Sequence, residues 1–174
     1  MIISSHIITA TAVTLPLIVA PTNTGNIALI FAAAFCSHYV LDLIPHWDYQ
    51  LSSIKTCYRQ EKIGYIKKSE IKKDFLRILI DGLLGISVSF LIINLAPASL
   101  KEKSFILFLA IIASILPDFF EVLYIFFKKQ PISFLHKIHL IFHRRNIYIG
   151  EPQKGIPLQV AVISAIVILF VFIL

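Results

Sequence analysis

The sequence is poor in cysteine and lacks the short signatures of several hydrolase classes. Its two cysteines, Cys36 and Cys57, match neither a zinc-knuckle spacing nor a disulfide framework. The chain has no His-Glu-x-x-His, no Gly-x-Ser-x-Gly and no P-loop, which argues against an intramembrane metalloprotease and a serine hydrolase. No Lys or Arg precedes the apolar residues from Ile2 onward. The charged region of a cleavable signal peptide is therefore missing, and residues 2–20 are expected to form a mature helix.

Apolar residues are abundant instead. They make up 57% of the 174 residues, and the mean hydropathy is +0.84. Apolar runs of roughly 18 or more residues are typical of membrane-spanning helices. We predict one all-α, membrane-embedded domain over residues 1–174, a bundle of about five transmembrane helices with an interfacial helix. The spans are expected at about residues 2–20, 26–44, 74–95, 104–127 and 156–174.

Two polar segments separate these spans. Residues 45–73 are Lys-rich, and we expect a turn at residues 45–49 followed by one surface helix. The segment 128–155 is basic, and its middle, Ile132–Phe142, is amphipathic enough to lie in the membrane interface.

The basic residues predict the topology. Eight of the 16 Lys and Arg lie in residues 45–77 and six in residues 128–155, on segments that two spans separate. Because two spans lie between these segments, both are on the same face of the membrane. The positive-inside rule makes that face cytoplasmic, with the N-terminus inside and the C-terminus outside. Because the net charge of +6 is carried by loops that flank apolar spans, it indicates topology determinants and no nucleic-acid partner.

The ionisable residues of the spans gather near that same face. At ~1.5 Å per residue, all six His and every acid within a span fall within roughly 15 Å of the inner boundary. These residues, with those of the adjoining loops, are His6, His38, Asp42, His46, Asp48, Asp81, Asp118, Glu121, His136, His139 and His143. Their common depth predicts one shared site between the helices.

The densest group is Ser37-His-Tyr-Val-Leu-Asp-Leu-Ile-Pro-His-Trp-Asp48. His38 and Asp42 are four residues apart and so share a helix face. Pro45 allows a bend that turns His46 and Asp48 back toward that face. Imidazole and carboxylate together suit zinc, or manganese and iron where carboxylates predominate. The alternative is that His38 and Asp42 hydrogen-bond inside the bundle, and that His46-Trp-Asp48 anchors the chain at the membrane interface.

Carboxylates in the third and fourth spans extend this candidate site. A carboxylate deep in a bilayer costs ~3 kcal/mol even on lenient scales, so Asp118 and Glu121 need a partner. We favour a metal or a His over a structural ion pair. Asp81 is a further candidate ligand, and its alternative is a salt bridge with Arg77 four residues earlier.

A third group follows the fourth span. His136, His139 and His143 have spacings of three and four, which place them along one helical stripe. Two could be ligands and one an acid–base group. Arg144 and Arg145 suit a phosphate or a lipid headgroup, and the alternative is contact with an anionic lipid surface.

At these residues the chain resembles the YdjM-like bacterial inner-membrane proteins, which are described as metal-dependent hydrolases. The resemblance lies in His6, Ser37-His-x-x-x-Asp42, Leu116-Pro-Asp118 and His143-Arg144. In that family the Pro-Asp and His-Arg elements precede the Ser-His element, whereas here they follow it. The resemblance implies a polytopic membrane hydrolase, distantly similar to zinc-dependent phospholipase C.

These observations predict a hydrolase of a phosphate or ester bond, with a lipid-like or phosphorylated substrate at the cytoplasmic leaflet of a bacterial inner membrane. The expected metal ligands are His6, His38, Asp42, His46, Asp81, Asp118 and His143. The expected acid–base and charge-neutralising residues are Asp48, Glu121, His139 and Arg144. The alternatives are a divalent-cation transporter, and a non-enzymatic membrane scaffold whose basic loops bind a partner or anionic lipid.

Overall fold

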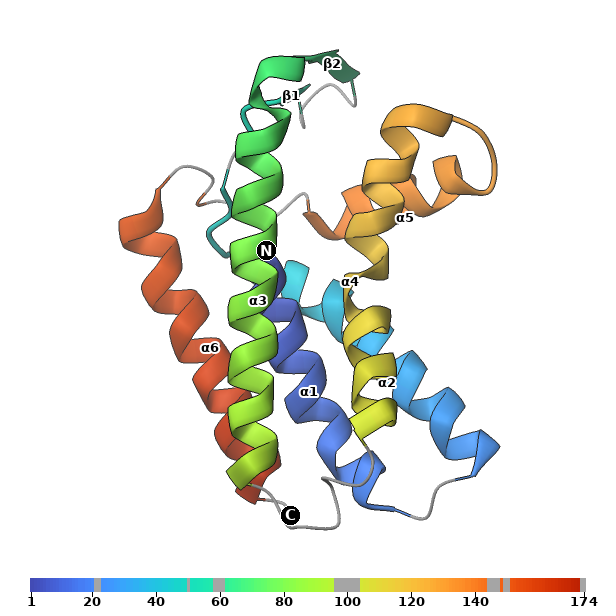
Figure 1. The fold of residues 1–174 in the computed structure, drawn as a ribbon, viewed down its shortest axis with the longest axis vertical. Coiled ribbons are helices and arrows are strands. Elements are labelled where there is room, and N and C mark those ends of the chain that lie inside the picture. Colours follow the sequence, from blue (N-terminus) through green and yellow to red (C-terminus); the bar gives the residue numbers. More distant parts are fainter. Residues whose placement is uncertain are drawn as a thin grey trace.

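A computed structural model describes residues 1–20, 23–49, 51–57, 62–95, 104–143, 148 and 151–172 (Figure 1). Six helices form the bundle, and one short hairpin lies at its end. The helices are α1 (Ile3–Val19), α2 (Thr24–Asp42), α3 (Ile71–Leu95), α4 (Ser104–Phe127), α5 (Ile132–His143) and α6 (Pro152–Phe172). The hairpin has strands β1 (Ile54–Cys57) and β2 (Lys62–Ile66), and the short 3-10 helix η1 (Lys68–Glu70) leads into α3. The predicted all-α membrane bundle is confirmed.

Four helices, α2, α3, α4 and α6, are long and apolar enough to cross a membrane. Large apolar side chains remain exposed on their outer surfaces, among them Phe75, Leu91, Phe105 and Val160. In an integral membrane protein such side chains face lipid. The remaining predicted span is α1, whose 17 residues extend about 26 Å.

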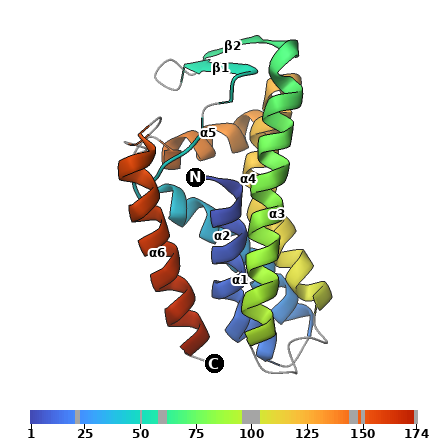
Figure 2. The same ribbon diagram turned by 60° about the vertical axis from the view of Figure 1, so that its left-hand side comes forward.

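Helix α1 is the central helix of the bundle. It packs against α2, α3, α4 and α6, and Figures 1 and 2 show it between them. Its buried surface carries small and hydroxyl-bearing side chains, which allow helix backbones to approach closely in membranes. The Thr11 hydroxyl donates to the Ile7 carbonyl at 2.9 Å and lies 2.8 Å from the Ser89 Oγ of α3. Gln159 of α6 donates to the Ser5 hydroxyl. These contacts fix the rotation of α1 about its axis.

The segment between α2 and α3 differs from the prediction. In place of one surface helix over this Lys-rich stretch, the chain forms an antiparallel pair in which Ile54 faces Ile66, and Thr56 faces Ile63. The Ser53 backbone N–H donates to the buried Asp74 carboxylate at 2.6 Å, which ties the hairpin to α3. Isoleucine, threonine and tyrosine favour strands, and here they outweigh the helix-favouring lysines.

Helix α5 confirms the expected helix over the amphipathic segment. With 12 residues it is too short to span a bilayer, and it packs against α4 and α2. The hairpin, η1 and α5 lie at one end of the molecule (Figures 1 and 2). We call this the basic end, since exposed Lys67, Lys68, Lys128 and Lys129 lie there.

Candidate metal centre

Five segments bring ionisable side chains together near the basic end. They are the first turns of α1, the last turns of α2, the loop after α2, the middle of α4, and α5. In Figure 1 the beginning of α1, marked N, lies beside the end of α2, with α5 close above. The predicted gathering of polar groups from several helices is therefore present.

Asp42 lies at the middle of the cluster and is completely buried. Its Oδ1 is 3.4 Å from the Nε2 of His6 and 3.8 Å from the Nε2 of His46. Its Oδ2 is 3.2 Å from the Nε2 of His38 and 3.7 Å from the Nε2 of His139. Each carboxylate oxygen thus has two imidazole nitrogens beside it.

Asp118 of α4 provides a second carboxylate. Its Oδ1 is 3.6 Å from the Nε2 of His38 and 3.8 Å from the Nε2 of His139. The Asp118 side chain is 27% exposed, whereas that of Asp42 is fully buried. The cluster can therefore be reached from outside at Asp118.

Among the described residues, two groups of three have donor atoms within 4.8 Å of one another, which is close enough to hold a metal ion. One is His6, His38 and Asp118, and the other is His38, Asp42 and His139. A tetrahedral zinc ion with bonds near 2.1 Å places its ligand atoms about 3.4 Å apart. The separations of His38 and His6 from Asp42, 3.2 and 3.4 Å, match that value.

Hydrogen bonds orient two of the imidazoles toward the carboxylates. The Nδ1 of His38 is 2.8 Å from the Ser114 carbonyl, and the Nδ1 of His46 is 2.6 Å from the Ile44 carbonyl. A carbonyl can only accept, so each Nδ1 carries a proton, and in the neutral ring each Nε2 would present a lone pair to the cluster. Metal-binding histidines are oriented in this way.

His6 adds a buried group whose polar atoms fit a cation. Its ring stacks on that of His38 at 3.7 Å, and neither ring nitrogen has a hydrogen-bond partner among the described residues. An unsatisfied buried polar group costs about 1–3 kcal/mol, and metal binding would remove that cost. The donor set therefore suits zinc or another transition metal.

A positive group already lies beside these carboxylates. The Met1 amino nitrogen is 2.9 Å from the Asp42 Oδ1 and 3.7 Å from the Asp48 Oδ2. Asp48, a predicted catalytic residue, therefore shares the Met1 amino group with Asp42.

Glu121 and His136 form a pair next to the cluster. The Nδ1 of His136 contacts the Glu121 carboxylate, and the His136 ring stacks on Tyr124 at 3.8 Å. Glu121 is one turn after Asp118, and His136 is one turn before His139. A metal or a His was expected as the partner of Glu121, and the partner is His136. The matching spacing of three residues on both helices was the signal for this pair.

Asp81, a predicted ligand, lies elsewhere. Its Oδ2 is 3.4 Å from the Tyr49 hydroxyl, and neither three-residue group includes it. The alternative salt bridge with Arg77 is not the one formed, because Arg77 pairs with Asp74 at 3.6 Å. Hydropathy gives the depth of Asp81 in α3 but not the direction in which this side chain points.

His139, predicted as an acid–base residue, lies 3.7 Å from Asp42 and 3.8 Å from Asp118, and it belongs to one of the two groups that could hold a metal. Two other predicted residues lie outside the described part of the site. The backbone of His143 ends α5, but its side chain and the whole of Arg144 are not among the described residues.

Replacing Tyr49 with Phe tests the contact with Asp81. Burial and the Asp81 carboxylate raise the pKa of Tyr49, so its hydroxyl stays protonated and can donate. Tyr49→Phe should cost about 1 kcal/mol of unfolding free energy near pH 7. Because the pKa is raised on folding, this contribution is complete below about pH 10 and falls at higher pH. Thermal unfolding of both proteins at pH 7 and above pH 10 measures it, and equal midpoints at pH 7 would contradict it.

No family model, curated protein or solved structure matches this chain.

Proposed function

We propose that this protein is a membrane-embedded, metal-dependent hydrolase that cleaves a phosphate or ester bond in a lipid at the cytoplasmic leaflet of a bacterial inner membrane. The observation that carries the proposal is the position of Asp42, whose carboxylate has four imidazole nitrogens within 3.8 Å. Burying two carboxylates and four imidazoles in a membrane protein is costly. The Met1 amino group offsets part of this cost at Asp42, and a metal ion held by the imidazoles would offset more.

The surrounding residues suit hydrolysis. A bound zinc ion, or manganese or iron, would lower the pKa of water to about 7 and polarise a phosphoryl or carbonyl oxygen. His6, His38, Asp42, His46, Asp118 and His139 are the residues that would hold it. The Glu121–His136 pair lies one helical turn away and can hold or release a proton. Arg144 as a phosphoryl-binding residue stays a prediction from the sequence.

The position of the partly exposed Asp118 carboxylate supports a lipid substrate. The exposed edge of the cluster is Asp118, which lies nine residues, or roughly 13 Å, before the end of α4. A substrate that reaches this depth beside a membrane-spanning helix can do so from within the leaflet. The basic end supplies cations of the kind that attract phosphate.

Metal analysis of the purified protein tests the proposal. We expect at least one zinc, manganese or iron per chain in detergent, and release of phosphate or acid from a panel of phospholipids and lipid phosphates. Chelation should reduce turnover by a factor of about 100 or more, and metal should restore it. A folded, metal-free protein contradicts the proposal. Metal uptake into proteoliposomes without turnover would instead support the transporter.

A further inference from the structure

Helix α5 has two faces of different character. The face toward the bundle carries His136, His139 and Leu140, all buried. On the opposite face Phe134 is 58% exposed and Ile141 59% exposed. Lys137, also exposed, lies between them on the same stripe, because spacings of three and four residues share one side of a helix.

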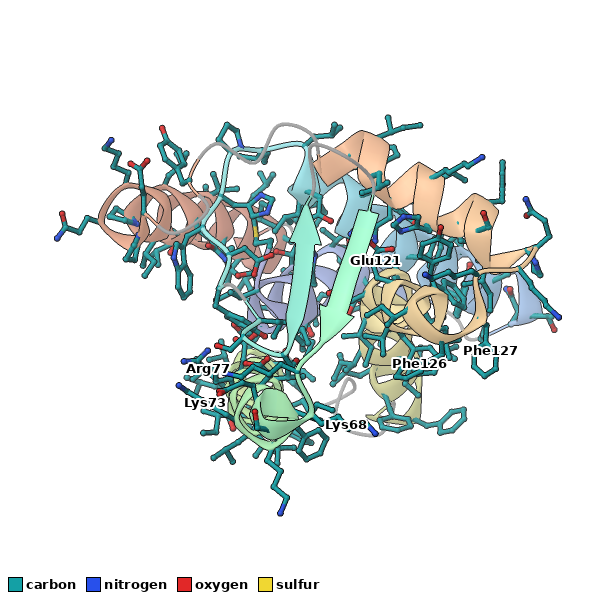
Figure 3. The ribbon with its side chains drawn as sticks, turned by 90° about the horizontal axis from the view of Figure 1, so that it is seen from above. Lys68, Lys73, Arg77, Glu121, Phe126 and Phe127 are labelled. Carbon is teal, nitrogen blue, oxygen red and sulfur yellow. The ribbon has the colours of Figure 1, made fainter. Side chains whose placement is uncertain are left out.

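The end of α4 continues this surface. Phe126 and Phe127 are exposed there, and exposed Lys128 and Lys129 follow them directly. Figure 3, seen from above, shows Phe126 and Phe127 at the outer side of α4, with Glu121 on the side toward the hairpin. We call Phe126–Lys129 together with Phe134, Lys137 and Ile141 the α5 surface.

The charge of this region has one sign. Between Glu121 and Glu151 the sequence has five Lys and Arg and no Asp or Glu. Apolar side chains interleaved with cations, on a helix too short to span, are typical of segments that lie in the headgroup region of an anionic leaflet. A water-soluble partner would leave the exposed Phe126 and Phe127 unexplained, since they are the last residues of a membrane-spanning helix.

We propose that the α5 surface docks into the anionic leaflet at the basic end, and that this docking holds His139 in the metal centre. The second part rests on the proposed function. His139 lies three residues after His136, on the buried face of α5. The exposed Phe134 and Ile141 lie before and after it on the opposite face. Its Nε2 reaches Asp42 at 3.7 Å and Asp118 at 3.8 Å only while α5 stays against α4 and α2.

Site-specific labels test the docking. Single cysteines replace Phe134 and Ile141 in a chain carrying Cys36→Ala and Cys57→Ala, and bimane labels are read in nanodiscs of phosphatidylcholine with or without one-third phosphatidylglycerol. Val160, exposed on the apolar helix α6, is the lipid control, and the exposed loop residue Ser52 is the water control. We expect doxyl lipids to quench both α5 labels as they quench the Val160 label, and more strongly with phosphatidylglycerol. Iodide quenching equal to that at Ser52 would overturn the docking.

A charge variant tests the anionic preference. The triple variant Lys128→Gln, Lys129→Gln and Lys137→Gln should lose the extra quenching in phosphatidylglycerol. The matched control is Lys154→Gln, which should leave the quenching unchanged, since Lys154 is an exposed cation of α6 that pairs with Glu151 directly before that helix. Equal quenching in the two lipid mixtures, for the protein with its lysines, would overturn the preference.

The rate of zinc release to a chelator tests the coupling to His139. This rate does not depend on the cation concentration at the membrane surface. We expect release to be at least threefold slower in phosphatidylglycerol nanodiscs, and the triple variant should abolish the difference. Equal rates would overturn the coupling. A protein without metal in either lipid would overturn the proposed function and the coupling together, while the labels would still decide the docking.

Discussion

Asp42→Asn is expected to lower the zinc affinity of the protein by a factor of at least about 100 and to abolish turnover. Removing an outer partner of a metal ligand typically costs 10- to 100-fold in affinity, and loss of a direct ligand costs more. Asn keeps the shape of Asp42 but removes the charge that the four imidazoles surround. Elemental analysis after gel filtration and titration against a chelator of known affinity measure the effect.

Asp74→Asn is the matched control. Asp74 is also a buried carboxylate near the basic end, but it accepts the Ser53 N–H and pairs with Arg77. Its replacement should lower stability by about 1.5–3 kcal/mol and leave the metal content unchanged. Asp81→Asn should likewise retain the metal, because Asp81 contacts Tyr49. Full metal content in Asp42→Asn would contradict the candidate centre.

Gly85→Ala is expected to destabilise the bundle and to weaken metal binding as well. A Cβ at Gly85 would lie 2.7 Å from the Ser4 Cα and 3.1 Å from the Ile7 Cβ. The Ser4 atom belongs to the backbone, so α1 and α3 must move apart. Such overpacking costs typically about 1–3 kcal/mol. Ser4 and Ile7 flank His6, so the shift should also displace that imidazole from its place beside Asp42.

Gly82→Ala is the control that distinguishes the steric effect of the added methyl group at Gly85 from the general effect of replacing Gly with Ala in α3. Gly82 lies about one turn earlier on α3, and a Cβ there would meet only Ile3, at 3.9 Å. This variant should be neutral or more stable by up to about 1 kcal/mol, because Ala favours helix over Gly. Chemical unfolding in detergent and zinc titration compare the two variants. Equal stability of Gly85→Ala and Gly82→Ala would show that α1 and α3 are not packed as described.

The sequence predicted the membrane class and the depth of the polar groups because both depend on composition along the chain. Apolar runs mark the helices, and a spacing of four put His38 beside Asp42 in the structure, with Nε2 and Oδ2 3.2 Å apart. Pro45 correctly predicted the return of His46, which reaches Asp42 at 3.8 Å. Local geometry was sufficient for these residues.

The rotation of each helix could not be predicted in the same way. Asp81 lies at a suitable depth in α3 yet points to Tyr49, because the packing of α1 between helices decides which side chains meet. The stripe of His136, His139 and His143 was predicted, but the contacts of His139 with Asp42 and Asp118 were not, since they join three different helices. The hairpin was not predicted because the many lysines of this segment favour a helix, whereas the pairing of β1 with β2 depends on contacts between residues far apart in the segment.

The central position of α1 has a consequence for how the molecule is made. Helix α1 precedes its neighbours in the chain and carries the buried groups Ser5 and His6, whose partners Gln159 and Asp42 lie in α6 and α2. During synthesis α1 must wait in the bilayer or at the insertion machinery without these partners until α2 and α6 have been made. Gln159 reaches Ser5 only after α6 has inserted, so degradation of the nascent protein should be greater before α6 is in place than after it.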